Sequence, residues 1–107
     1  MASSWVNVDM AQAIPVGDYR VVTLATTEVA VINVDGKFYA IEDICTHDYS
    51  GLTGGDICGR EIICPRHGAG FDICTGQVLA PPAYEDIATF PTRVHEGTVQ
   101  VRDNRND

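Results

Sequence analysis

Basic residues are scarce in this chain of 107 residues. Seven Lys and Arg face fifteen Asp and Glu, which gives a formal net charge of −8 at pH 7. A surface of that sign repels nucleic-acid phosphates and anionic lipid headgroups, so we expect neither nucleic acid nor a membrane among the partners. The same charge suits electrostatic steering toward a basic patch on another protein, although many acidic proteins have no such partner.

Long hydrophobic runs are also missing. The longest apolar stretches, such as residues 29–34 and 38–41, are far shorter than the roughly 20 residues of a bilayer-spanning helix. The N-terminus lacks a basic segment followed by an apolar stretch and a small-residue cleavage site, so it does not resemble an export signal. We expect a cytoplasmic protein with a single domain over residues 1–107, because this length supports one hydrophobic core.

Helical periodicity is absent as well, and the chain is therefore predicted to be all-β, with short antiparallel strands. Strand-like segments occupy residues 5–8, 19–24, 29–34, 37–42, 61–64, 71–73, 90–95 and 98–102. The strongest local pattern is Asp35-Gly36 between two β-branched and aromatic segments, which is typical of a hairpin. Residues 90–95 and 98–102 are expected to pair across Glu96-Gly97.

A loop-rich segment at about residues 43–83 differs from the rest of the chain. It is rich in Gly and Pro and contains all four cysteines. A loop region of this length in a compact domain requires something besides a hydrophobic core to hold it together. Because a reducing cytosol keeps thiols free, the cysteines are more consistent with metal binding than with disulfides.

Two pairs of possible metal ligands lie in this segment, Cys45-Thr-His47 and Cys64-Pro-Arg-His67. One thiolate and one imidazole in each pair fit either a tetrahedral zinc ion or a [2Fe–2S] cluster with two His ligands on one iron. Structural zinc sites usually place both Cys before both His. The alternation of Cys and His therefore favours the cluster, while zinc stays open on spacing alone.

The ligand pairs and their flanking residues resemble the two cluster loops of Rieske proteins. The similar residues are Cys45, His47, Cys64, His67, Gly68, Phe71, Asp72, Thr75 and Gly76. The similarity extends over nearly the whole chain, and it is closest to the bacterial Rieske ferredoxins that serve ring-hydroxylating dioxygenases. Residues 76–82 also resemble a further loop that covers the cluster in that group.

The resemblance implies a Rieske fold: an antiparallel β-sandwich or barrel with an inserted cluster-binding subdomain at about residues 43–83. It implies one [2Fe–2S] cluster per chain. Cys45 and Cys64 would bind the buried iron, and His47 and His67 the iron nearer the surface.

Departures from the pattern concern four positions. In respiratory Rieske proteins a disulfide joins the cluster loops, and Ser50 and Arg66 occupy the corresponding positions here. Those proteins also place a Ser and a Tyr hydroxyl against the cluster sulfurs, where this chain has Ala69 and Phe71. Rieske potentials span about −150 to +300 mV, and without these donors we expect the low end, on the order of −150 mV.

The function implied is electron transfer. The protein would carry one electron from an NAD(P)H-dependent flavoprotein reductase to a terminal non-haem iron oxygenase, as a monomer that makes transient, electrostatic contacts. It would not be an enzyme, because only His95 remains to build a mononuclear iron site of two His and one carboxylate. The alternatives are a Rieske protein for iron–sulfur assembly or nitrite reduction, and a zinc-stabilised binding module.

Three further positions have simpler interpretations. Cys58 and Cys74 lie outside the ligand pattern and are expected to be small buried apolar residues. His95 is expected at the surface. Asp72 either accepts backbone hydrogen bonds that orient the second ligand pair or is an ordinary solvated carboxylate.

Overall fold

A computed structural model describes residues 4–46 and 50–105. The strands are β1 (Val6–Met10), β2 (Tyr19–Leu24), β3 (Thr27–Val34), β4 (Lys37–Glu42), β5 (Asp56–Cys58), β6 (Glu61–Ile63), β7 (Gly70–Asp72), β8 (Val78–Ala80), β9 (Thr89–Phe90), β10 (Thr92–His95) and β11 (Thr98–Val101). One short 3-10 turn, η1 (Ala11–Ala13), follows β1. Within these residues no helix has the length and apolar character needed to cross a bilayer.

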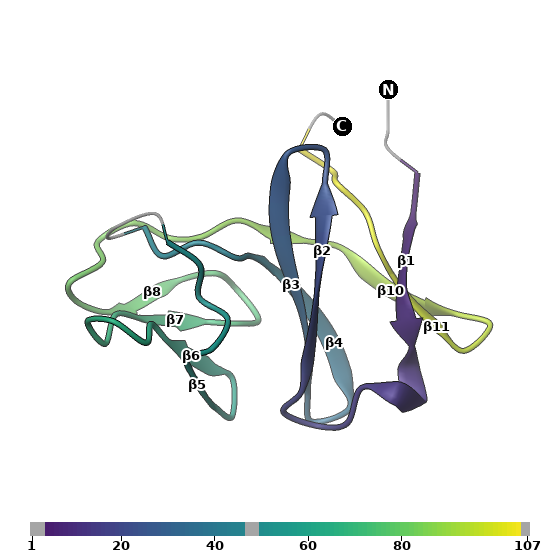
Figure 1. Ribbon diagram of the computed structural model, residues 1–107, viewed down its shortest axis with the longest axis horizontal. Coiled ribbons are helices and arrows are strands. Elements are labelled where there is room, and N and C mark those ends of the chain that lie inside the picture. Colours follow the sequence, from purple (N-terminus) through teal and green to yellow (C-terminus); the bar gives the residue numbers. More distant parts are fainter. Residues whose placement is uncertain (1–3, 47–49, 106–107) are drawn as a thin grey trace.

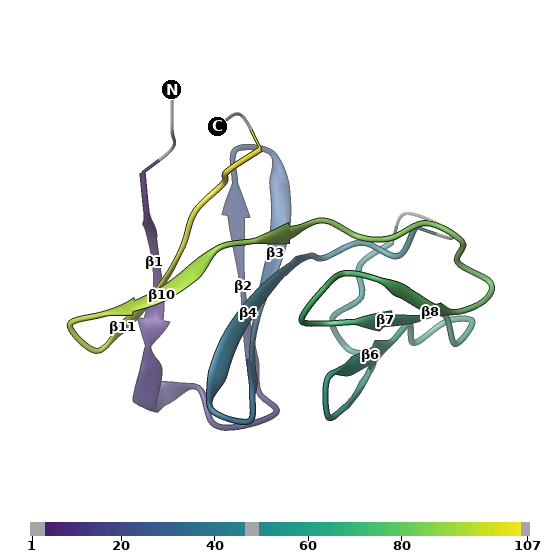
Figure 2. The ribbon, with the colours of Figure 1, turned by 180° about the vertical axis from the view of Figure 1, so that it is seen from behind.

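Three antiparallel sheets make up the molecule. We call β1-β11-β10 the terminal sheet, β2-β3-β4-β9 the central sheet and β5-β6-β7-β8 the inserted sheet. The central sheet lies between the other two in Figure 1, and the reverse view in Figure 2 shows the same order. The prediction of an all-β antiparallel fold with a segment inserted between its strands is confirmed.

Strand β3 lies at the centre because both of its faces are buried. Val29 and Val31 pack into the core shared with the terminal sheet, whereas Ala30 and Ile32 pack into the core shared with the inserted sheet. All four side chains are 0% exposed. Successive residues of a strand point to opposite faces, so this apolar run supplies two cores at once.

The predicted hairpin forms as expected. Val34 pairs with Lys37 across Asp35 and Gly36, whose φ values are 53° and 92°. Positive φ at both central residues gives a two-residue turn whose twist matches that of the flanking strands. The expected pairing across Glu96-Gly97 is also present, with His95 opposite Thr98.

Two strands were not predicted, and one predicted strand is divided. β5 and β8 have only three residues each and lie at the two edges of the inserted sheet. Part of the segment 76–82, expected to be a loop, is thus strand β8. The predicted strand 90–95 breaks at Pro91, where the chain passes from the central sheet to the terminal sheet. Proline cannot donate to a sheet ladder, which explains the break.

Asp72 organises the turn between β7 and β8. Its Oδ1 accepts the N–H groups of Cys74 at 2.8 Å and Thr75 at 3.0 Å, and its Oδ2 accepts Arg60 Nε at 2.9 Å. Burial raises the pKa of this carboxyl, but the Arg60 bond and the two backbone bonds outweigh it and hold the pKa below its usual value. Asp72 is therefore not an ordinary solvated carboxylate, but its backbone hydrogen bonds shape the turn after β7 and not the second ligand pair.

Asp72→Asn is expected to lower the free energy of unfolding by about 1–2 kcal/mol at neutral pH, because a charge-assisted bond is lost. A depressed folded-state pKa stabilises the protein above the unfolded value of about 3.9, and this contribution disappears as the pH falls through the folded value. In urea titrations, the difference in unfolding free energy between wild type and variant should therefore become smaller below about pH 4.

Asp18→Asn is the matched control for Asp72→Asn. Asp18 also pairs with an arginine, at 3.1 Å from Arg20, but its side chain is 46% exposed against 13% for Asp72. Exposed pairs contribute about 0–1 kcal/mol, so its effect should be smaller. If the difference in unfolding free energy between wild type and Asp72→Asn stays constant down to about pH 3, the stability contribution of Asp72 does not depend on its ionisation, which would contradict the prediction.

Gly55 allows the segment before β5 to approach the end of β6. A Cβ at this position would collide with the carbonyl oxygen of Ile63 and would lie 3.1 Å from Cδ of Pro65. The close approach therefore depends on the absence of a side chain rather than on unusual backbone angles.

Gly55→Ala should destabilise the protein by about 1–3 kcal/mol, the cost of overpacking a rigid backbone contact. Gly51→Ala is the control, since its Cβ would meet Asp43 Oδ1 at an ordinary 3.6 Å. Equal thermal stability of the two variants would show that the segment can relax around Gly55.

Candidate metal centre

Two of the predicted ligands, Cys45 and Cys64, lie deep in the protein. Their exposures are 0% and 2%, and both belong to the core between the central and inserted sheets. Neither forms a disulfide. Three loops meet at this end of the inserted sheet: the first loop (residues 43–55), the second loop (64–69) and the third loop (81–88). Cys45 lies on the first loop and Cys64 begins the second.

The second loop is a tight turn that separates the thiol from the imidazole. Cys64 N–H donates to Ala69 O at 2.7 Å, and Gly68 N–H donates to Cys64 O at 3.1 Å. Gly68 has φ of +78°, a conformation that a residue without Cβ adopts readily. The turn therefore buries Cys64 while His67 stays exposed.

The first loop is closed by its own hydrogen bonds. Cys45 N–H donates to Ser50 O at 2.7 Å. Asp43 Oδ1 accepts the N–H groups of Leu52 at 2.7 Å and Thr53 at 2.9 Å. His47, the remaining predicted ligand, lies outside the described residues, so three of the four predicted ligands are placed.

The donors that are placed fit a Rieske cluster chemically. Two buried sulfurs and one exposed imidazole match an inner iron bound by thiolates and an outer iron bound by histidine. Within residues 4–46 and 50–105, no three His, Cys, Asp or Glu side chains converge as they would on a single metal ion.

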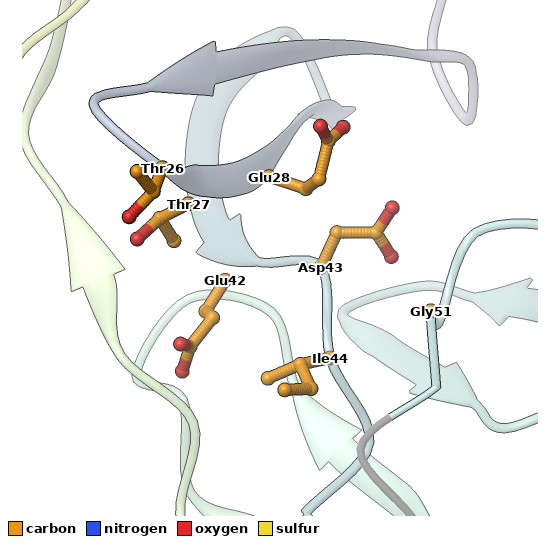
Figure 3. Close-up of a pocket in the computed structure, with 7 residues that line it drawn as sticks. All are labelled: Thr26, Thr27, Glu28, Glu42, Asp43, Ile44 and Gly51. Carbon is orange, nitrogen blue, oxygen red and sulfur yellow. The ribbon is translucent and has the colours of Figure 1, made fainter.

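Among the residues that the structure describes, the carboxylates beside the first loop do not converge on a second metal site. A cavity of about 370 Å³ is lined by Thr26, Thr27, Glu28, Glu42, Asp43, Ile44 and Gly51. Figure 3 shows that the carboxylates of Glu42 and Asp43 point away from each other. Asp43 instead binds the first loop from within, through Leu52 and Thr53.

The surroundings of the two thiols are apolar. Ala69 and Phe71 are both 0% exposed and share the core of Cys45 and Cys64. Neither side chain carries a hydroxyl group, so these positions supply no side-chain hydrogen bond to sulfur. On the third loop, Ala83 and Ile87 are buried in the same core.

The remaining cysteines are not both buried, which corrects one expectation. Cys58 is exposed, because it ends β5 immediately before the surface turn at Gly59 and Arg60. Cys74 is half-buried against the core. The electrostatic effect of the nearby Cys74 side chain, followed by burial, raises the pKa of Tyr39. His95 is exposed, as expected.

Sequence reasoning missed two residues that connect the loops. Thr46 Oγ1 donates to Glu85 O, and Arg66 Nη2 donates to Gly51 O. The position of each residue between a predicted Cys and a predicted His was visible in the sequence. The partners were not, because both are backbone carbonyls selected by the tertiary arrangement of the loops.

Known proteins similar to this chain include ferredoxin components of dioxygenase systems. The ferredoxin component of the naphthalene 1,2-dioxygenase/salicylate 5-hydroxylase systems of Ralstonia sp. is 35% identical over 102 residues, 95% of this chain and 98% of the relative. A structure of a complex of reduced oxygenase and oxidised ferredoxin in carbazole 1,9a-dioxygenase matches with a TM-score of 0.87 and 36% identity, over 92% of each chain. The Sphingomonas yanoikuyae B1 ferredoxin matches with a TM-score of 0.85 and 32% identity, over 94% of this chain and 99% of that one.

A family model decides between the two metal centres that the spacing left open. The model for the Rieske [2Fe–2S] domain matches residues 4–91. The predicted Rieske-type [2Fe–2S] cofactor is thereby confirmed and the zinc-stabilised module set aside. With its three antiparallel sheets, its two buried thiols and a match over most of its length, the chain belongs to the Rieske [2Fe–2S] domain family.

Proposed function

We propose that this protein is a one-electron carrier that delivers electrons to a terminal oxygenase of the ring-hydroxylating type. The proposed ligands are Cys45, His47, Cys64 and His67. The proposed domain is the whole chain, with the cluster-binding subdomain at about residues 43–83. The observation that carries the proposal is that ferredoxin components align with 95% of the chain and are themselves covered to 98%, which leaves no separate catalytic domain in the matched length.

The burial of the proposed ligands supports electron transfer through the exposed histidine side of the site. When bound, the cluster supplies a reversible one-electron couple. Cys45 and Cys64 would exclude water from one side of it, because both thiols lie in the core. His67 is exposed and follows Arg66 on the surface of the second loop. The imidazole edge is therefore the part of the proposed site that a partner protein can approach.

The proposed partners are a flavoprotein reductase that oxidises NAD(P)H and a non-haem iron oxygenase, both in the cytoplasm. The partner of the carbazole relative is an oxygenase, which supports the second assignment by similarity. The net charge of −8 supports transient, electrostatically steered contacts with basic surfaces. Three of the seven basic residues lie over aromatic rings outside the three loops: Arg93 and Arg102 on Trp5, and Arg105 on Phe90.

Two measurements test the proposal: the iron and sulfide content of the protein, and electron transfer to an oxygenase. Protein purified anaerobically should contain iron and acid-labile sulfide in equal amounts, and after reduction it should pass one electron to a purified terminal oxygenase of the naphthalene or carbazole type. Zinc in place of iron and sulfide would contradict the cofactor. Reduced protein that stays reduced in the presence of every such oxygenase would contradict the acceptor.

The absence of hydroxyl donors near sulfur predicts a midpoint potential at the low end of the Rieske range, about −150 mV. Ala69→Ser and Phe71→Tyr should each raise the potential, because a hydrogen bond to sulfur stabilises the reduced state. Protein-film voltammetry measures the change. Ala40→Ser, which adds a hydroxyl at a buried alanine of the other core, is the control and should leave the potential close to wild type.

Electrostatic steering predicts that added salt slows association with the oxygenase. Glu85→Gln removes an exposed charge from the third loop and should lower the association rate by about twofold at low ionic strength. Stopped-flow measurement of electron transfer provides the rate. Glu96→Gln, in the β10–β11 turn on the opposite side of the molecule (Figure 1), is the matched control. Equal rates for both variants at all salt concentrations would contradict steering toward the cluster end.

A further inference from the structure

In each proposed ligand pair, one residue between the Cys and the His extends toward a different loop. Thr46 follows Cys45 on the first loop, and its Oγ1 donates to Glu85 O of the third loop at 2.7 Å. Arg66 precedes His67 on the second loop, and its Nη2 donates to Gly51 O of the first loop at 3.0 Å. The two bonds join the second loop to the first and the first to the third.

The first and second loops also have hydrogen bonds of their own. Cys45 N–H to Ser50 O shapes the first loop, and Cys64 N–H to Ala69 O shapes the second. Bonds of this kind fix the shape of each loop without fixing the distance between loops. A cluster bound by residues of both loops requires that distance to be correct, so bonds between loops reduce the cost of organising the site.

The position of Arg66 makes its bond to the first loop informative. By the resemblance described above, Ser50 and Arg66 occupy the two positions that a disulfide joins in respiratory Rieske proteins. Arg66 bonds to Gly51, the residue after Ser50. A polar contact thus spans the two loops at the place where a covalent link is absent.

We propose that Thr46 and Arg66 are positioning residues that hold the three loops at the spacing the cluster requires and thereby slow its loss. The inference rests on the ligand set given under Proposed function. Both bonds use backbone carbonyls as acceptors, so their effect depends on the donor side chains alone.

The test compares variants that remove a donor with variants that retain one. Thr46→Val removes the hydroxyl at constant shape, and Thr46→Ser keeps it. Arg66→Met removes donors and charge while keeping an apolar stem, and Arg66→Lys keeps a donor and the charge. The rate of cluster loss is followed by visible absorbance in the presence of an iron chelator, and far-ultraviolet circular dichroism follows unfolding of the sheets.

Thr46→Val and Arg66→Met should each lose the cluster about fivefold faster than wild type, the factor that corresponds to a net hydrogen bond of about 1 kcal/mol. Thr46→Ser should lose the cluster at the wild-type rate, and the rate for Arg66→Lys should lie between those of wild type and Arg66→Met. Arg93→Met is the matched control, because it removes an exposed arginine that stacks on Trp5 in the terminal sheet.

Three results would overturn the inference: wild-type rates of cluster loss in Thr46→Val and Arg66→Met, an equal acceleration in Arg93→Met, or sheet unfolding that accelerates in step with cluster loss. Failure of the proposed function is distinguishable, because wild-type protein would then contain no iron and sulfide. If a donor-deleted variant assembles no cluster, recovery in its conservative counterpart supports the inference, and failure of both counterparts to assemble one overturns it.

Discussion

The burial of two thiols, Cys45 and Cys64, between the central and inserted sheets is the constraint on which the structure depends. The inserted sheet has strands of only three residues, and such short strands form a stable unit only when packed against something else. They pack on the face of β3 that carries Ala30 and Ile32, in the core that also contains both thiols. The proposed ligands Cys45 and Cys64 are therefore part of the hydrophobic core, so a cluster bound there would add to the stability of this end of the molecule.

The same arrangement explains how the two ends of the molecule differ. On one side of β3 the core with the terminal sheet is built from aliphatic side chains and Phe90, and the hairpins there need no cofactor. On the other side, long loops are held by single side chains: Asp43 closes the first loop, and Asp72 shapes the turn after β7. Electron transfer needs an exposed edge on a rigid base, and this asymmetry provides both.

Sequence predicted the parts of the fold that local pattern determines. β2 and β4 have the predicted bounds, residues 19–24 and 37–42. β5 and β8 were missed because three-residue edge strands carry too little pattern, and their pairing is imposed by β6 and β7. In the site, spacing predicted two ligand pairs, and the structure shows Cys45 and Cys64 buried and His67 exposed. It could not predict the exposure of Cys58 or the carbonyl partners of Thr46 and Arg66, since these depend on tertiary contacts between distant residues.

The central claim is asymmetric ligation by the protein, with two cysteine thiolates on one iron and two imidazoles on the other. Electron paramagnetic resonance of the reduced protein, with isotopically labelled histidine nitrogen, tests it most directly. The account predicts hyperfine coupling to two histidine nitrogens that persists in His95→Gln, because His95 is exposed at the end of β10, outside the proposed ligand set. A spectrum without coupling to histidine nitrogen, as for a cluster bound by four thiolates, would contradict it.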